Sequence, residues 1–557
     1  MVPVSRTVVA MVLLAGTAAA GPPTTRQDGA HARVAVGRAG ELRPAREVVG
    51  RREEPLTAEE ETAKQIERLL RGPLRSGITG LYVADAKTGE PLFAVNADDA
   101  LNPASNVKMI STATALELLG PDFRYATRVL GSEPDAQGEI HGSIYLLGSW
   151  DPTLDAADFD ELALGIAARG VKQLDGDVVI GSDATRDGIF RAVVPIEVTA
   201  GPAGEPAIAS APPGFDLVTF QVAAKTGKAP ARAHLTYTTT TTKDAAGHVR
   251  VQLAIAGAIG KGSKTTYSLL VPERAQTAAH LLRAALRAHG VAIKGDVAVA
   301  ELGDFISDAT LTGTLPIELA RHQSAPLAEI VAHVNKWSIN WLADRVIISA
   351  AAIAKREAPS MELALDAMYG WLARHAHVDR GDATLDTGSG LSYKTRITTR
   401  ELVSVVRGAA GFTSDVDPAL ARAWVDSLSV GGNDGTLGHR FRTPEVRGRL
   451  YGKTGTLSTV IALSGVLALD PARPLAFSIV TNGDRPLAKA YVRKAHEQVV
   501  GLICKYIAKT AKTPAATAPP ADAPAVVHPT IPDDLEETEP DPLLDGDAAG
   551  SAATPAP

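Results

Sequence analysis

Three short motifs in a fixed order carry side chains that could perform acyl transfer. They are Ser105–Lys108 (Ser-Asn-Val-Lys), Ser338–Asn340 (Ser-Ile-Asn) and Lys453–Gly455 (Lys-Thr-Gly). Together they offer a serine nucleophile, a lysine that can take its proton, a hydroxyl and amide pair, and a second cation. Each motif alone is weak, but the S-x-x-K pattern occurs only once in the chain and the order is specific. The set predicts a serine enzyme that works through an acyl intermediate.

The residues around Ser105 predict that it lies in the first turn of a helix. Asn102 suits an N-cap, Pro103 suits the first helical position, and the helix is expected to run to about Leu119. Amides of a first turn have no partner within the helix, so they can stabilise developing negative charge. Lys108 follows by three residues and shares the face of the serine. It can act as a base if burial or a second cation keeps it neutral.

The middle motif lies in the stretch 326–351, whose apolar spacing predicts helix. Ser and Asn are disfavoured in helix interiors and often mark a cap or a break. Two interpretations follow. Ser338 and Asn340 form a polar kink between helical turns, or Ser338 relays a proton to the leaving amine while Asn340 binds a substrate amide.

Lys-Thr-Gly occurs twice, at Lys225–Gly227 and at Lys453–Gly455. The first copy precedes Ser338 and runs into a proline, which ends a strand or lies on an edge. The second copy follows Ser338 and leads through Thr456 into an apolar stretch typical of a strand. Glycine lets a ligand backbone approach closely, and an exposed edge can pair with an extended peptide. Because Thr454 can donate to a carboxylate that its lysine neutralises, we assign the second copy to the site.

Length and composition limit the function classes. The chain has 557 residues, 45% of them apolar and 21% charged, which favours two to three globular domains. A net charge of -7 offers no basic surface for nucleic acid. The 13 histidines include no H-E-x-x-H pair, so we expect neither a metal nor another cofactor.

The first twenty residues predict an export signal. Arg6 precedes the apolar run Val8–Ala20, which ends in small residues and is too short for a membrane span. We predict that this segment directs export and is then removed. The alternative is that it stays uncleaved as an anchor. Composition predicts a disordered linker at 21–56 and a disordered tail at 509–557. The single cysteine, Cys504, excludes an intrachain disulfide.

Alternating helices and strands are predicted between these ends. Apolar spacing over 58–70 predicts a helix capped by Thr57. The segments 79–83 and 91–96 predict two strands around a turn. These elements precede the Ser105 helix and are expected to support it.

Four further segments extend the pattern: Gly148–Leu154, Ser389–Ser392, Asp434–Leu437 and Ala476–Gly483. With them, residues 56–507 resemble the low-molecular-weight class C penicillin-binding proteins. These are D-alanyl-D-alanine carboxypeptidases/endopeptidases of the peptidase S13 family. The departures are Ser149 and Trp150 in place of glycines, Thr387 in place of Asp, and Ile339 in place of Asp or Asn. They affect the fit of substrate more than the chemistry.

The resemblance implies an α/β (α+β) fold, with a transpeptidase-like or serine β-lactamase-like domain split by a β-rich insertion of one or two small domains. The domain would comprise 57–124 and 306–508, and the insertion 125–305. The insertion explains why Lys108 and Asn340 are 232 residues apart. Local patterns predict two strands and a helix inside it, at 231–242, 249–256 and 275–288.

The resemblance also implies the activity: cleavage of D-Ala-D-Ala termini or of cross-links in peptidoglycan stem peptides, with acylation by β-lactams. Ser105 would be the nucleophile and Lys108 its base, with catalytic roles for Ser338, Asn340 and Lys453. Amides of Ser105 and Thr456 would stabilise the oxyanion, and substrate would lie along Thr454, Gly455 and Thr456.

Two alternatives are a β-lactamase and a catalytically silent cell-wall binding protein. The sequence contains no Glu-x-x-Leu-Asn segment of the kind a class A β-lactamase uses for deacylation. The expected location is the periplasm or extracytoplasmic envelope, with peripheral association at most and no transmembrane span. Preference for carboxypeptidase or endopeptidase action and the oligomeric state are left open.

Overall fold

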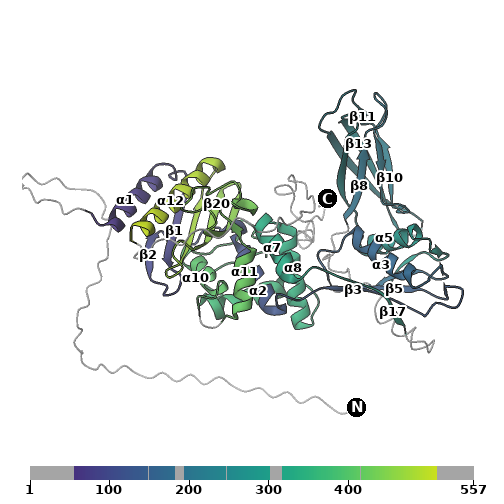
Figure 1. Cartoon of the computed structure of the whole chain (residues 1–557), viewed down its shortest axis with the longest axis horizontal. Coiled ribbons are helices and arrows are strands. Elements are labelled where there is room, and N and C mark those ends of the chain that lie inside the picture. The colour runs from purple at the N-terminus through teal and green to yellow at the C-terminus, as the bar shows by residue number, and fades with distance from the viewer. Residues whose placement is uncertain are drawn as a thin grey trace, which may run out of the picture. The chain divides into compact units, whose positions relative to one another are not determined.

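The structure is a computed structural model (Figure 1). It describes residues 56–148, 150–181, 193–245, 247–300, 316–413 and 416–510. The expected signal at 1–20, nearly all of the expected linker and tail, and Ser149 lie outside the described residues.

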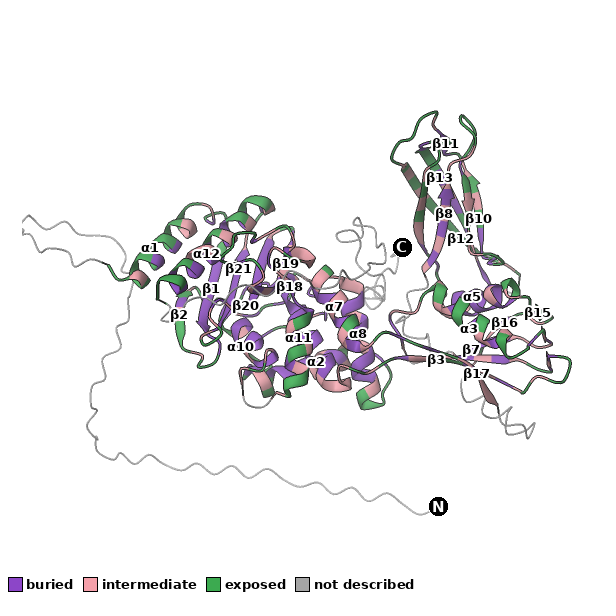
Figure 2. Ribbon diagram, viewed as in Figure 1, coloured by how far each residue is buried: buried purple, intermediate pink, exposed green. Residues whose placement is uncertain are grey.

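A six-stranded antiparallel sheet in the order β18-β19-β20-β21-β1-β2 joins segments from both ends of the described chain. Its strands, in sheet order, are Ser429–Val430, Leu450–Leu457, Val460–Leu467, Leu475–Asn482, Ile78–Asp85 and Pro91–Val95. The strands expected at 79–83 and 91–96 are confirmed, and the segment 476–483 that carried the resemblance forms most of β21. Every residue of β20 is buried, so both faces of the sheet are covered (Figure 2).

Alternate residues of β1 divide the core into two layers. Leu81 and Val83 belong to one buried cluster with residues of α12 (Lys489–Thr510), and α1 (Ala58–Arg71) packs on α12. Tyr82 and Ala84 point to a second cluster that includes α10 (Thr399–Ala409). This period of two is expected for a strand buried on both faces. The helix expected at 58–70 is confirmed, and Thr57 closes a capping box with Glu60.

Helix α2 (Lys108–Leu119) is the centre of the helical layer. Nine of its residues are buried, from Lys108 to Leu116. It packs against α10 and four further helices: α7 (Leu327–Trp337), α8 (Asn340–Lys355), α9 (Met361–Trp371) and α11 (Pro418–Ser427). A helix buried on all sides holds its first residues firmly, because every face is fixed by packing.

The residues between α2 and α7 form sheets of their own and a separate buried cluster. A five-stranded sheet has the order β16-β7-β5-β3-β17, with bounds Val297–Ala300, Val178–Gly181, Ile144–Leu147, Ala126–Gly131 and Ile317–Gln323. Helices α3 (Ala156–Ala168) and α5 (Arg274–Ala288) pack against strands of this sheet.

The remaining strands of this region form three smaller sheets. One contains β10 (Val218–Val222), β11 (Lys225–Thr226), β12 (His234–Lys243) and β13 (Val249–Ile259). The others contain β8 (Val193–Thr199), β9 (Ile208–Ser210) and β14 (Lys264–Leu270), and β4 (Glu139–Ile140), β6 (Gln173–Leu174) and β15 (Ala292–Ile293). The strands expected at 231–242 and 249–256 and the helix expected at 275–288 are confirmed. Helix α3 was not expected.

None of the helices in the described ranges combines the length and the apolar run that crossing a bilayer requires.

A buried histidine links α12 to the central sheet. Nε2 of His496 lies 2.8 Å from Oγ1 of Thr481 on β21, and Nδ1 has no hydrogen-bond partner among the described residues. Burial, with a smaller effect of the positive charge of Arg440, lowers the pKa of His496 from 6.5 to about 3. The folded protein therefore keeps this ring neutral under conditions in which the unfolded chain protonates it.

We predict that His496→Gln reduces the loss of stability in mild acid. In the unfolded chain His496 binds a proton below pH 6.5, whereas in the folded chain it does so only near pH 3. The neutral ring therefore costs no stability above pH 6.5, and the free energy of unfolding falls as the pH is lowered from there towards pH 3. At pH 5 this loss is about 2 kcal/mol. Denaturant titrations at pH 7 and pH 5 should show the wild type losing about that much more than the variant. Equal losses would contradict the prediction.

Candidate active site

Ser105 lies on a short 3-10 segment, η1 (Ala104–Val107), directly before α2. The expectation of an α-helical first turn capped by Asn102 is therefore wrong in detail. Oδ1 of Asn102 does accept a hydrogen bond from the Ala104 amide at 2.8 Å, but the α-helix begins only at Lys108. Ala104 has a φ of +46°, which lies in the left-handed region, so no regular right-handed helix can extend back through this residue to Asn102. Ser105 thus follows a strained residue.

The amine of Lys108 is surrounded by three acceptors. Nζ lies 2.9 Å from Oγ of Ser105, 2.6 Å from Oδ1 of Asn340 and 2.8 Å from the carbonyl oxygen of Ser389. The lysine has no exposed surface. Burying such a group requires that its donors be satisfied, and here they are. The arrangement holds the amine within hydrogen-bond distance of the Ser105 hydroxyl.

The second lysine lies in a similar setting on β19. Nζ of Lys453, which is also fully buried, donates to Oγ of Ser338 at 2.7 Å and to the carbonyl of Thr454 at 2.9 Å. Oγ1 of Thr454 donates to Oγ1 of Thr436 at 2.9 Å. The side chains of Ser338 and Lys453 are therefore connected, as a proton relay requires.

The break between α7 and α8 positions the middle motif. Ser338 ends α7 with φ at +60°, Ile339 is extended, and Asn340 begins α8. The stretch 326–351, expected as one helical region with a cap or a break, is thus two helices separated at the motif. The break points Ser338 to one lysine and Asn340 to the other.

Gly455 allows the backbone of β19, which carries Lys453, to lie close to the backbone before Ser105. A Cβ atom at this position would lie 2.6 Å from the carbonyl oxygen of Pro103 and 3.2 Å from Cβ of Ala104. Only glycine permits β19 to pass so near η1. Strand β18 pairs with β19 only at Tyr451 and Gly452, so among the described strands none pairs with that edge from Lys453 onward.

The first Lys-Thr-Gly copy lies in another sheet. Lys225 and Thr226 form β11, which pairs with β13, and Oγ1 of Thr226 accepts a hydrogen bond from the Gly201 amide at 2.9 Å. This copy has a local structural role in its turn.

Three residues around the lysines were given no role in the sequence analysis. Ser389 supplies a carbonyl to Lys108, Thr436 accepts from Thr454, and Oδ1 of Asp344 accepts from the Ser389 amide at 2.7 Å. Ser389 and Thr436 fall in segments that carried the resemblance. The signal for Asp344 was its spacing, four residues after Asn340 on one helix.

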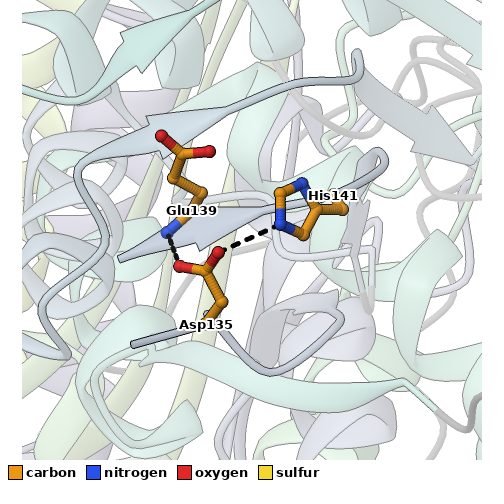
Figure 3. Close-up of side chains that lie close together, drawn as sticks. All are labelled: Asp135, Glu139 and His141. Carbon is orange, nitrogen blue, oxygen red and sulfur yellow. Dashed lines mark hydrogen bonds and ion pairs between the residues drawn. The ribbon is translucent and has the colours of Figure 1, made fainter. Parts of the chain in front are cut away.

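Two groups of acidic side chains around a histidine lie outside this constellation. One is Asp135, Glu139 and His141 (Figure 3). Asp135 and His141 already have partners, because Asp135 accepts from the Glu139 amide and bonds to His141, while His141 also bonds to Asp175. The other group is Asp158, Glu161 and His322. Both groups lie in the region between α2 and α7, and the chemistry above uses neither.

Comparison with known proteins identifies the family of the chain. The model of the D-Ala-D-Ala carboxypeptidase 3 (S13) family matches residues 62–189 and 188–506. The chain belongs to this family. A D-alanyl-D-alanine carboxypeptidase of Actinomadura sp. (strain R39) is 30% identical over 472 residues, which are 78% of this chain and 83% of that protein. A carboxypeptidase of Mycobacterium tuberculosis is 30% identical over 72% of this chain and 76% of its own length.

The fold is also that of a solved family structure. Penicillin binding protein 4 of Haemophilus influenzae superimposes with a TM-score of 0.60 at 20% identity, over 79% of this chain and 99% of that one. The expected mixed α/β fold is therefore confirmed. Its family makes this chain a serine hydrolase of the D-Ala-D-Ala carboxypeptidase type.

We predict that Asn340→Ala slows release of D-alanine from a D-Ala-D-Ala-terminated peptide by about a hundredfold, since the amine of Lys108 loses the acceptor at 2.6 Å that orients it. The matched control is Asn433→Ala, an exposed residue of the loop before η3 (Gly435–Leu437). Equal rates for the two variants would show that Asn340 does not orient the base.

Proposed function

We propose that this protein is an exported serine D-Ala-D-Ala carboxypeptidase or D,D-endopeptidase that acts on peptidoglycan stem peptides through an acyl-enzyme. The observation that carries the proposal is the 2.9 Å contact between Nζ of Lys108 and Oγ of Ser105 at the start of a fully packed helix. Membership of the S13 family supports the substrate class. The apolar run Val8–Ala20, typical of an export signal, supports the location.

Acylation begins when Lys108 takes the hydroxyl proton of Ser105. Oγ then attacks the carbonyl carbon of a D-alanine residue and forms a tetrahedral intermediate whose oxygen is negative. The amides of Ser105 and Thr456 are the proposed donors to that oxygen, and loss of one such donor typically costs ~3 kcal/mol of barrier. They come from η1 and β19, the two segments that Gly455 allows to approach.

Expulsion of the leaving amine requires a proton on its nitrogen. Ser338 is the proposed donor, and Lys453, 2.7 Å from its Oγ, can resupply that proton. Collapse of the intermediate leaves the acyl group on Ser105. Lys108 then passes the proton it took from Ser105 to the Ser338–Lys453 pair, which replaces the proton given to the amine. A water molecule attacks the ester, Lys108 takes the proton of that water and returns it to Oγ of Ser105, and the free acid and the free serine result.

Substrate binding is proposed along β19. The edge beyond Gly452 has no paired strand among those described, so an extended peptide can add to it. Thr454 and Lys453 suit the carboxylate of a terminal D-alanine, which a hydroxyl can bind and a cation can neutralise. A β-lactam presents a similar carbonyl and carboxylate, and the Haemophilus influenzae protein has been solved as a complex with a β-lactam.

We predict that a fluorescent penicillin forms a stable adduct with the wild type, mapped to Ser105 by peptide mass spectrometry, and forms none with Ser105→Ala. Stability of the adduct follows from slow attack of water on the acyl ester. The same pair should differ on purified sacculi, where only the wild type releases D-alanine or cleaves cross-linked muropeptides.

Absence of an adduct on Ser105 would refute the nucleophile assignment. Rapid turnover of nitrocefin with intact muropeptides would identify a β-lactamase instead. Identical behaviour of wild type and Ser105→Ala on muropeptides would identify a catalytically silent binding protein.

A further inference from the structure

Helix α8 carries two side chains that reach the surroundings of Lys108. Asn340 and Asp344 are four residues apart and therefore share one face of the helix. Asn340 accepts directly from Nζ of Lys108 at 2.6 Å. Asp344 accepts from the amide of Ser389 at 2.7 Å, and the carbonyl of Ser389 accepts from Nζ of Lys108 at 2.8 Å. One helix thus supplies one acceptor for the lysine and anchors the other.

The segment that includes Ser389 is pressed between α8 and the nucleophile. A Cβ atom on Gly388 would lie 2.6 Å from Cγ2 of Ile347 and 3.2 Å from Oδ1 of Asp344. A Cβ atom on Gly390, where φ is +77°, would lie 2.1 Å from the carbonyl oxygen of Ala104. Neither side has room for a side chain, so the backbone at Ser389 is held closely between α8 and η1.

The carboxyl group of Asp344 is costly in this position. Its residue keeps some exposed surface, but the carboxyl lies among protein atoms, and this desolvation raises its pKa to about 6. Hydrogen bonds from Ser389 and the charge of Lys108 oppose the rise without cancelling it. A carboxylate that costs stability at neutral pH and lies beside a catalytic base is typical of a functional residue.

Charged residues on the other helices that pack on α8 have different surroundings. Glu362 and Asp366 of α9 are exposed. Lys336 of α7 pairs with Asp434 at 2.7 Å. From α2, the charged group that acts on Asp344 is Lys108. The negative charge of Asp344 is therefore coupled to the lysine that is to serve as base.

We propose that Asp344 is a positioning residue for acylation: its carboxylate fixes the backbone at Gly388 and Ser389, so that the Ser389 carbonyl holds the amine of Lys108 against Ser105. This inference rests on the proposed function, because it concerns the base of that reaction. The negative charge has a second effect, since it favours the protonated form of Lys108. Asp344 thus fixes the position of the Lys108 amine, but it also makes that amine harder to deprotonate.

The test compares Asp344→Asn and Asp344→Ala with the wild type and with Glu362→Gln, a matched exposed carboxylate on α9. The second-order rate of acylation by a fluorescent penicillin is measured from pH 5 to pH 9, and thermal midpoints are recorded. We expect both Asp344 variants to acylate at least about tenfold more slowly at the optimum, with alanine the slower. The acid limb of Asp344→Asn should move to lower pH, because the lysine has lost its anionic neighbour. Its thermal midpoint at pH 8 should be no lower than that of the wild type, because a desolvated charge is gone.

Three results would overturn the inference. An Asp344→Asn rate within about twofold of the wild type would show that the carboxylate does not position the lysine. A slow rate with an unmoved acid limb and a lowered thermal midpoint would show that Asp344 only supports the fold. If the wild type itself forms no adduct on Ser105, the proposed function fails, and this inference fails with it. The wild-type measurement therefore tests the proposed function, and the comparison of variants tests the role of Asp344.

Discussion

The burial of Lys108 is the constraint on which the rest of the structure depends. An amine without exposed surface must find an acceptor for each of its donors within the protein, and the acceptors here come from η1, α8 and the segment at Ser389. None of these segments is adjacent to another in the chain. Their meeting point can be kept only if the elements that carry them are rigid. The helical layer provides this rigidity by surrounding α2 with five helices.

A second constraint acts on the backbone. The strained φ of Ala104, the left-handed Ser338 and the glycines at 388, 390 and 455 all lie where two segments pass within contact distance. Strain of this kind persists only when the surrounding structure enforces it. Ala104 and Ser338 lie in or beside the three motifs, whereas β19, β20 and β21 pair there in unbroken antiparallel register. Regular strands and irregular turns therefore meet where the proposed chemistry occurs.

Local physics accounts for how much of this was predictable. The Thr57 cap, the strands at 78–85 and 91–95 and the helix at 274–288 follow from spacing and turn residues that act within a few positions. The motif residues could be found because their order along the chain is specific, although each motif alone is weak. The 3-10 turn at Ser105 could not, because Ala104 packs against Gly390 and Gly455, which lie far away in sequence. Ser389 and Asp344 were missed for the same reason, since Ser389 lies 281 residues beyond Lys108.

The strands at the two ends of the intervening region have a consequence for folding. Strand β3 leaves the first part of the chain, β17 returns to the second, and they pair antiparallel, with Tyr125 and Ser324 in mutual hydrogen bonds at 3.0 Å although they are 199 residues apart. Once this pair has formed, α2 and α7 are joined by a short bridge instead of a long loop. Most of the entropic cost of bringing the two ends of this long segment together then falls on the folding of the intervening region itself. Contacts of very high sequence separation, such as that between Lys108 and Asn340, become nearly local events in assembly.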